Sequence, residues 1–330
     1  MTHNVTNLGA FNERDGLVKI DVCGDGNFRT GKDGVVGIYA TGDRKVEFID
    51  FGTHTLAYVA SAIGYPAYYP VKPVSVEKPI KAVLMDLDGT SVRSEEFWIW
   101  IIQKTVASLL GDDGFALDKA DLPFVSGHSV SEHLQYCIDK YCPDKDLQTA
   151  RELYFDHTHY EMNEIMCGRG KKGAFTPSPR LKEFLTELKK LGIKIGLVTS
   201  GLYEKAWPEI TSAFDTLGMG KPEDFYDCAI SAGFALRKGS VGTLGELSPK
   251  PHPWLYAETA TVGLNIPEAD RAHVIGIEDS GAGVASVRLA GFAAIGLAGG
   301  NIEQSGAKGL CSLYCDSLDE ISEYIKKVNS

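Results

Sequence analysis

From residue 82 onward, short apolar runs alternate with segments of helical periodicity, and this alternation constrains the fold more than any other feature of the chain. Four of these runs are rich in Ala, Val, Ile and Leu: residues 82–85, 193–198, 272–277 and 293–297. Strands buried on both faces are apolar throughout, and strands that alternate with helices form a parallel sheet covered on both sides. The sequence therefore predicts an α/β fold built on a doubly wound parallel sheet.

Helical segments follow the apolar runs. They are expected over residues 95–110, 181–191, 252–264, 281–290 and 318–328. The stretch 118–167 is also mostly helical in pattern and contains no apolar run of the kind that forms a central parallel strand. Ligand sites in open α/β sheets lie at the carboxyl ends of the strands, so functional residues are expected there.

The first 78 residues have a different pattern. Short runs rich in Val, Ile, Phe and Tyr, at 17–23, 35–39 and 45–51, are separated by Gly-Asp turns and predict strands. Three prolines then punctuate the stretch 69–81, which predicts an extended linker. Residues 1–78 are therefore expected to form a small β-rich module, and no motif within it indicates a chemical role.

The charge of the chain argues against several partners. The 330 residues carry a net charge of -11, whereas duplex nucleic acid requires a basic binding face, so neither nucleic acid nor an anionic membrane is expected to bind. No apolar run approaches the roughly 20 residues of a membrane span. Seven cysteines without a CxxC pair, and no export signal, favour reduced thiols and a cytoplasmic location. A homo-oligomer is left open.

The first candidate motif is Asp86-Leu-Asp88-Gly89-Thr, directly after the apolar run 82–85. Two carboxylates beyond a strand end can crowd round one hard cation, and Gly89 lets the chain turn sharply. An acidic surface turn is the alternative interpretation of this motif taken alone.

Two further motifs suit a phosphate group. Thr199-Ser200-Gly201 follows the run 193–198 and offers hydroxyl and backbone N–H donors to a phosphate oxygen, although an isolated Thr-Ser is also a common helix N-cap. Lys250 lies between this motif and the last one, in a loop whose prolines fix the backbone. It could neutralise a phosphoryl group and a carboxylate together, or it could be an exposed loop lysine.

The fourth motif is Glu278-Asp279-Ser-Gly-Ala-Gly, at the end of the run 272–277. A second acidic pair at the same sheet edge can complete a magnesium site. Dinucleotide binding is a weaker interpretation, because Ser286 replaces the third glycine of the fingerprint and the two acidic residues would repel a pyrophosphate.

In order and spacing, these four motifs resemble the haloacid dehalogenase-like (HAD) hydrolases, and most closely the β-phosphoglucomutase-like phosphatases among them. The resemblance covers roughly residues 81–327 and includes Lys250-Pro-His-Pro-Trp-Leu-Tyr and Leu289-Ala-Gly-Phe. It implies a Rossmann-like core over residues 79–93 and 178–330, with a helical cap domain inserted at 94–177.

The resemblance also implies the roles of the motif residues. Asp86 would be the nucleophile that forms an aspartyl-phosphate, and Asp88 would be the general acid and base. Thr199 would hold a phosphoryl oxygen with the help of the Ser200 N–H, and Lys250 would balance the charge between Asp86 and the phosphoryl group.

The implied cofactor is Mg²⁺. Asp86, the backbone carbonyl of Asp88 and Asp279 would bind it, with Glu278 either as a direct ligand or behind the direct ligands. This arrangement fits phosphoryl transfer, in which positioning and charge neutralisation do most of the work.

The sequence departs from the family pattern in the segment that leads into the cap. Ser91 and Arg93 are unusual in the run after Gly89, and Arg93 is either a contact to an anionic substrate or a surface residue. Phe124-Val-Ser-Gly-His128-Ser resembles the substrate-specificity loop of the family, so His128 is a candidate substrate contact.

Three functions follow as hypotheses. The leading one is a Mg²⁺-dependent phosphatase acting on a small phosphorylated metabolite, with a sugar phosphate as one candidate. The second is a sugar-phosphate mutase, although Phe97 and Trp98 occupy the neighbourhood where such mutases tend to carry a His. The third is a partner-binding protein with a vestigial core, which the retention of all the core positions disfavours.

Overall fold

The computed structural model describes residues 2–12, 16–60, 66–125, 130–233 and 248–330. The chain divides into two compact units. The first unit contains Met1–Ser91, Ser178–Ala206 and Gly220–Ser330, and the second contains Val92–Pro177 and Trp207–Met219.

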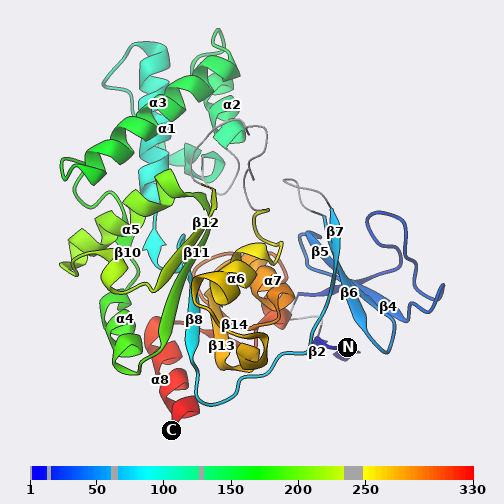
Figure 1. Ribbon diagram of the computed structural model, residues 1–330. Helices are drawn as coiled ribbons and strands as arrows, with labels where there is room; N and C mark the ends of the chain where they lie inside the picture. Colours follow the sequence, from blue (N-terminus) through cyan, green and yellow to red (C-terminus); the bar gives the residue numbers. More distant parts are fainter. Residues whose placement is uncertain (1, 13–15, 61–65, 126–129, 234–247) are drawn as a thin grey trace, which may run out of the picture. The chain divides into compact units, whose positions relative to one another are not determined.

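A six-stranded sheet forms the centre of the first unit (Figure 1). All of its strand pairs are parallel. In spatial order the strands are β12 (Cys228–Gly233), β11 (Lys194–Leu202), β8 (Ala82–Asp86), β13 (Val274–Glu278), β14 (Ala293–Leu297) and β15 (Leu313–Cys315). The chain builds outward from β8 in both directions, so β8 lies at the point where the strand order reverses. The predicted doubly wound α/β fold is confirmed.

Helices cover the two faces of this sheet (Figure 1). Helices α4 (Leu181–Lys190) and α8 (Leu318–Asn329) pack against each other on one side. Helix α6 (Trp254–Glu258), its π-helical continuation η4 (Thr259–Gly263) and α7 (Gly281–Ala290) lie on the other side. Each of these helical segments was predicted by periodicity, and each begins and ends within about two residues of the predicted bounds, the usual uncertainty in helix ends.

The N-terminal part of the first unit is an antiparallel five-stranded sheet (Figure 1). Its strands, in both spatial and sequence order, are β3 (Val18–Ile20), β4 (Gly37–Ala40), β5 (Val46–Asp50), β6 (Thr55–Val59) and β7 (Ala67–Pro70). The β-rich module is thus present, with a separate hairpin of β1 (Thr2–Val5) and β2 (Gly9–Asn12). Strand β7 extends into the stretch expected to be a linker, because an edge strand can end on a proline.

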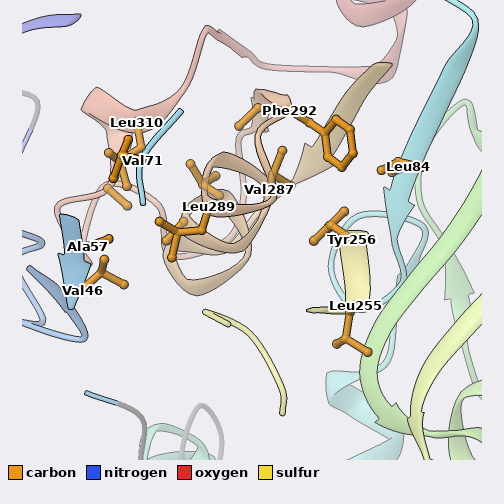
Figure 2. Packing of buried hydrophobic residues seen from close by; sticks show 14 of the residues in the cluster. Val46, Ala57, Val71, Leu84, Leu255, Tyr256, Val287, Leu289, Phe292 and Leu310 are labelled. Atoms are coloured by element: carbon orange, nitrogen blue, oxygen red, sulfur yellow. The ribbon is translucent and has the colours of Figure 1, made fainter. Parts of the chain in front are cut away.

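One hydrophobic core joins the N-terminal sheet to the six-stranded sheet. Figure 2 shows Val287 and Leu289 of α7 between two groups of side chains. Val46 and Ala57 of the N-terminal sheet lie on one side, and Leu84 of β8 lies on the other. Because α7 buries apolar side chains toward both sheets, the N-terminal sheet is part of the packing of this unit.

The second unit is mainly helical. A short antiparallel pair, β9 (Val92–Arg93) and β10 (Thr176–Pro177), connects the ends of its inserted segment. Its helices are α1 (Glu95–Leu110), η2 (Lys119–Phe124), α2 (Val130–Tyr141), α3 (Leu147–Met166) and most of α5 (Tyr203–Leu217). The segment 94–177 lies within this unit, and its role as a cap stays a prediction. Among the described residues, no helix combines the length and the apolar character that a membrane span requires.

Candidate active site

The candidate active site lies at the carboxyl ends of β8 and β13. Asp86 is the last residue of β8, and Glu278 is the last residue of β13. The two strands are paired in register up to Met85 and Ile277, so the two carboxylates leave the sheet side by side. One carboxylate oxygen from each of Asp86, Glu278 and Asp279 falls within 4.8 Å of the others. Ligands bind at such a topological switch point in open α/β sheets.

Lys250 enters this acidic group from a distant part of the chain. Its Nζ forms ion pairs with Asp86 and, at 2.7 Å, with Oε1 of Glu278. The Lys250 side chain is 7% exposed, and its backbone N–H donates to the Ser200 hydroxyl at 3.2 Å. The structure therefore brings together residues that the sequence separates by more than 150 positions.

Glu278 is fully buried and held by several groups. It accepts hydrogen bonds from the Tyr256 hydroxyl at 2.5 Å and from the Ser280 hydroxyl at 3.0 Å, in addition to the Lys250 ion pair. Gly283 lies so close that a Cβ there would be 1.9 Å from the Glu278 carboxyl carbon. A buried carboxyl group requires such partners, so these contacts hold the Glu278 side chain beside Lys250.

The site concentrates negative charge. Burial, followed by the charge of Glu278, raises the pKa of Asp86 well above its usual range, and the attraction of Lys250 only partly opposes this. The same two causes raise the pKa of Asp279 to about 7. Burial alone would lower the pKa of Lys250, but Asp86 and Glu278 outweigh it and raise this pKa. Three carboxylates facing one ammonium leave a deficit of positive charge that a cation would supply.

The donors fit a hard divalent cation. Asp279 is 9% exposed, and its buried Oδ1 accepts no hydrogen bond from the described part of the chain. Two glycines border this carboxylate: a Cβ at Gly89 would be 2.0 Å from Oδ2, and a Cβ at Gly300 would be 2.3 Å from it. Gly89 has a φ of +83°, which other residues rarely adopt. The site thus offers carboxylate oxygens, the ligands that Mg²⁺ prefers, in a space kept open by glycines.

The remaining predicted residues lie in different places. Asp88 is exposed, and its side chain is not one of the three acidic groups that cluster within the described residues. Arg93 is exposed on β9 in the second unit. His128 lies outside the described residues.

The sequence predicted that the Thr199 motif follows a strand. In the structure the motif lies within a strand. Strand β11 continues to Leu202, but its pairing with β8 stops at Val198, opposite Asp86. The register with β12 shifts after Thr199, so the motif projects beyond the central strand. Thr199 is buried, and its Oγ1 accepts a hydrogen bond from the Gly201 N–H at 2.9 Å.

The sequence analysis did not predict Tyr256 as a residue of the site. It belongs to the motif Lys250-Pro-His-Pro-Trp-Leu-Tyr, but nothing in that motif marks its hydroxyl as a partner of Glu278. The two residues are 22 positions apart, and only the packing of α6 against α7 brings them together.

Residues 80–291 match the family model of the haloacid dehalogenase-like hydrolases. This match spans more than half of the chain, so the chain belongs to the haloacid dehalogenase-like hydrolases. The predicted family is confirmed.

One relative of the chain is named as a phosphatase. The chain is 27% identical over 163 residues to a glyceraldehyde 3-phosphate phosphatase of Methanocaldococcus jannaschii. The match covers 43% of this chain and 66% of that protein, just under two thirds of its length.

Solved structures share the fold. A predicted phosphoglycolate phosphatase of Haemophilus somnus has a TM-score of 0.54 at 17% identity, covering 75% of this chain and 98% of that one. A protein of Thermotoga maritima assigned as a β-phosphoglucomutase has a TM-score of 0.52 at 18% identity, covering 75% of this chain and 99% of that one. At these identities the similarity shows the fold alone.

Proposed function

We propose that this protein is a Mg²⁺-dependent phosphohydrolase that removes phosphate from a small phosphorylated metabolite through an aspartyl-phosphate on Asp86. The observation that carries the proposal is the position of the Asp86 carboxylate. It lies at the switch point of the sheet, bound to Lys250 and close to Glu278 and Asp279.

The reaction has two displacements. In the first, a carboxylate oxygen of Asp86 forms a bond to phosphorus while the bond from phosphorus to the substrate oxygen breaks, and Asp88 donates its proton to that oxygen. In the second, Asp88 takes a proton from water, the water oxygen attacks phosphorus, and the bond to Asp86 breaks. Inorganic phosphate leaves, and both aspartates return to their starting states. The exposed side chain of Asp88 is accessible to substrate and water, as both steps require.

The other residues of the site neutralise and orient charge. Lys250 stabilises the developing negative charge between Asp86 and the phosphoryl group, and Glu278 holds the Lys250 ammonium in place. The Thr199 hydroxyl and the Ser200 N–H provide donors for the phosphoryl oxygens, and the Gly201 N–H, which donates to Oγ1 of Thr199, orients that hydroxyl.

The carboxylates of Asp86 and Asp279 and the backbone carbonyl of Asp88 would hold Mg²⁺, with Glu278 beside them. The ion, when bound, supplies positive charge to the phosphoryl oxygens. The fit of the donors to an oxygen-seeking cation supports this assignment.

The substrate proposal rests on chemistry and on one relative. The relative named for glyceraldehyde 3-phosphate supports a small phosphorylated carbon compound as the substrate class. Arg93 and His128 are proposed to contact the part of the substrate beyond the phosphate. A mutase would use the same aspartyl-phosphate but pass it to a second substrate hydroxyl.

Phosphate release from a panel of phosphorylated metabolites, measured with Mg²⁺ and with EDTA, tests the proposal. We expect magnesium-dependent release that disappears in Asp86→Asn. Asp33→Asn is the matched control, because Asp33 is exposed in a turn of the N-terminal region at a φ of +51° that Asn also tolerates. Release in Asp86→Asn equal to that of the control would overturn the proposal. Sugar-phosphate isomerisation without release would favour the mutase.

A further inference from the structure

The turn that carries Lys250 is held by side chains from three separate elements. The His252 N–H donates to the Pro249 carbonyl at 3.1 Å, which closes a four-residue turn around Lys250. The Lys250 N–H donates to the Ser200 hydroxyl on β11, and the Ser286 hydroxyl on α7 donates to the His252 carbonyl at 2.6 Å. Ser200 and Ser286 both belong to the α/β fold built on the six-stranded sheet.

The third contact comes from the N-terminal sheet. The Tyr69 hydroxyl on β7 lies 2.7 Å from Nδ1 of His252, across 183 positions of sequence. His252 is 1% exposed, and its other ring nitrogen has no hydrogen-bond partner within the described residues. The Tyr69 ring also packs edge-on against His252 and Trp254, with centroids 5.8 Å and 6.1 Å away.

Strand geometry separates Tyr69 from its neighbour Tyr68. Successive side chains of a strand point to opposite faces of the sheet. Tyr69 packs against the core shared with α7, whereas Tyr68 is exposed and bonds to Asp25 on the other face. One strand therefore carries two tyrosines, only one of which bonds to the Lys250 turn.

We propose that Tyr69 is a positioning residue for the phosphoryl-transfer site, and that it acts through His252 on the turn that places the Lys250 ammonium. This inference rests on the proposed function and deepens it. It assigns the N-terminal sheet a part in catalysis: among the described residues, the sheet supplies one of three side-chain contacts that hold the turn. Lys250 pairs with both Asp86 and Glu278, so a displacement of the turn would weaken the geometry of at least one of these ion pairs.

The test compares Tyr69→Phe with Tyr68→Phe, which removes the same hydroxyl from the same strand on the opposite face. We expect Tyr69→Phe to lower kcat for phosphate release by roughly 10-fold with KM little changed, because misplacement of a catalytic group affects the transition state most. Tyr68→Phe should keep the wild-type kcat. His252→Gln and the double variant complete a cycle, in which the two losses should be far from additive because the residues share one contact.

A second measurement does not depend on turnover. The ammonium nitrogen resonance of buried Lys250, assigned by its loss in Lys250→Arg, should shift in Tyr69→Phe and stay in place in Tyr68→Phe. If the wild-type protein releases no phosphate from any substrate, the proposed function fails and this resonance still tests the contact. If the wild type is active but Tyr69→Phe matches Tyr68→Phe in both kcat and the resonance, the inference is overturned. It is equally overturned if the loss of kcat only follows a loss of folded protein.

Discussion

At the scale of single residues, the contacts of the Glu278 carboxylate organise the site. Its carboxylate has no exposure and depends on Lys250, Tyr256 and Ser280 for its partners. A buried charge that loses a hydrogen-bond donor pays the cost of desolvation without compensation. The side chains around Glu278 are thus as important to the site as the residues expected to touch phosphate.

Tyr256→Phe tests this dependence. The substitution keeps the ring and removes only the hydroxyl that donates to Glu278, so we expect a loss of roughly 1–3 kcal/mol in the free energy of unfolding and a lower kcat. Urea denaturation and phosphate release would measure both. Tyr160→Phe is the control, because Tyr160 is 61% exposed. A Tyr256→Phe protein as stable and active as that control would contradict the assigned role.

Asp279 gives the site a pH dependence. Burial, followed by Glu278, raises its pKa from 3.8 to about 7. A carboxyl group with a raised pKa in the folded state favours folding below its unfolded pKa, and this contribution disappears as the pH rises through about 7. In EDTA, the wild type should therefore lose roughly 1–4 kcal/mol relative to Asp279→Asn between about pH 4 and about pH 8. Denaturation curves at both pH values check this, and a constant difference would contradict it.

At the scale of elements, the Glu278 side chain determines which residue helix α7 can carry at position 283. Ser280 caps its start by accepting a hydrogen bond from the Gly283 N–H, and Gly291 ends it with a φ of +88°. Gly283 is unfavourable inside a helix by about 1 kcal/mol relative to Ala. Its place is explained by the Glu278 carboxylate, which occupies the space a side chain would need.

Gly283→Ala should therefore destabilise the protein, although Ala has a higher helix propensity than Gly. The added methyl group would force the Glu278 carboxylate away from Lys250, and we expect a loss of roughly 1–3 kcal/mol in stability together with most of the activity. Thermal denaturation and phosphate release are the measurements. A stabilised and fully active variant would show that Glu278 can move without consequence.

The sequence predicted the elements unevenly, for identifiable reasons. Helices 95–110 and 281–290 were predicted to the residue from their helical pattern, and in the structure each ends at a glycine with positive φ, Gly111 and Gly291. Strands β6 and β7 were missed, since one is followed within a few residues by Gly-Tyr-Pro and the other ends in a proline. Asp86, Lys250 and Asp279 were predicted as site residues from motif order, whereas the contacts of Tyr69 and Tyr256 are contained in no local pattern.

At the scale of the whole molecule, the first unit has a core that includes buried side chains of the N-terminal sheet. Phe48 of the N-terminal sheet and Leu84 of the central sheet are both fully buried in this core. The packing predicts that the two sheets unfold together and do not behave as a module joined by a linker.

Phe48→Ala tests that cooperativity. We expect a loss of about 3–5 kcal/mol, as is typical for a buried phenylalanine. Hydrogen exchange followed by mass spectrometry should show faster exchange in β8 and β13 as well as in β5, because the opening is shared. Faster exchange confined to residues 1–78 would mean that the N-terminal sheet opens independently.

Chemical trapping would show whether Asp86 carries the phosphoryl group during turnover. Borohydride reduces an acyl phosphate to an alcohol, so quenching the protein during turnover of an active phosphomonoester should convert Asp86 to homoserine. We expect this modification at Asp86 alone, only with substrate and Mg²⁺ present, as read by peptide mass spectrometry. Phosphate release without any reduced residue at position 86, or with the modification at another carboxylate, would contradict it.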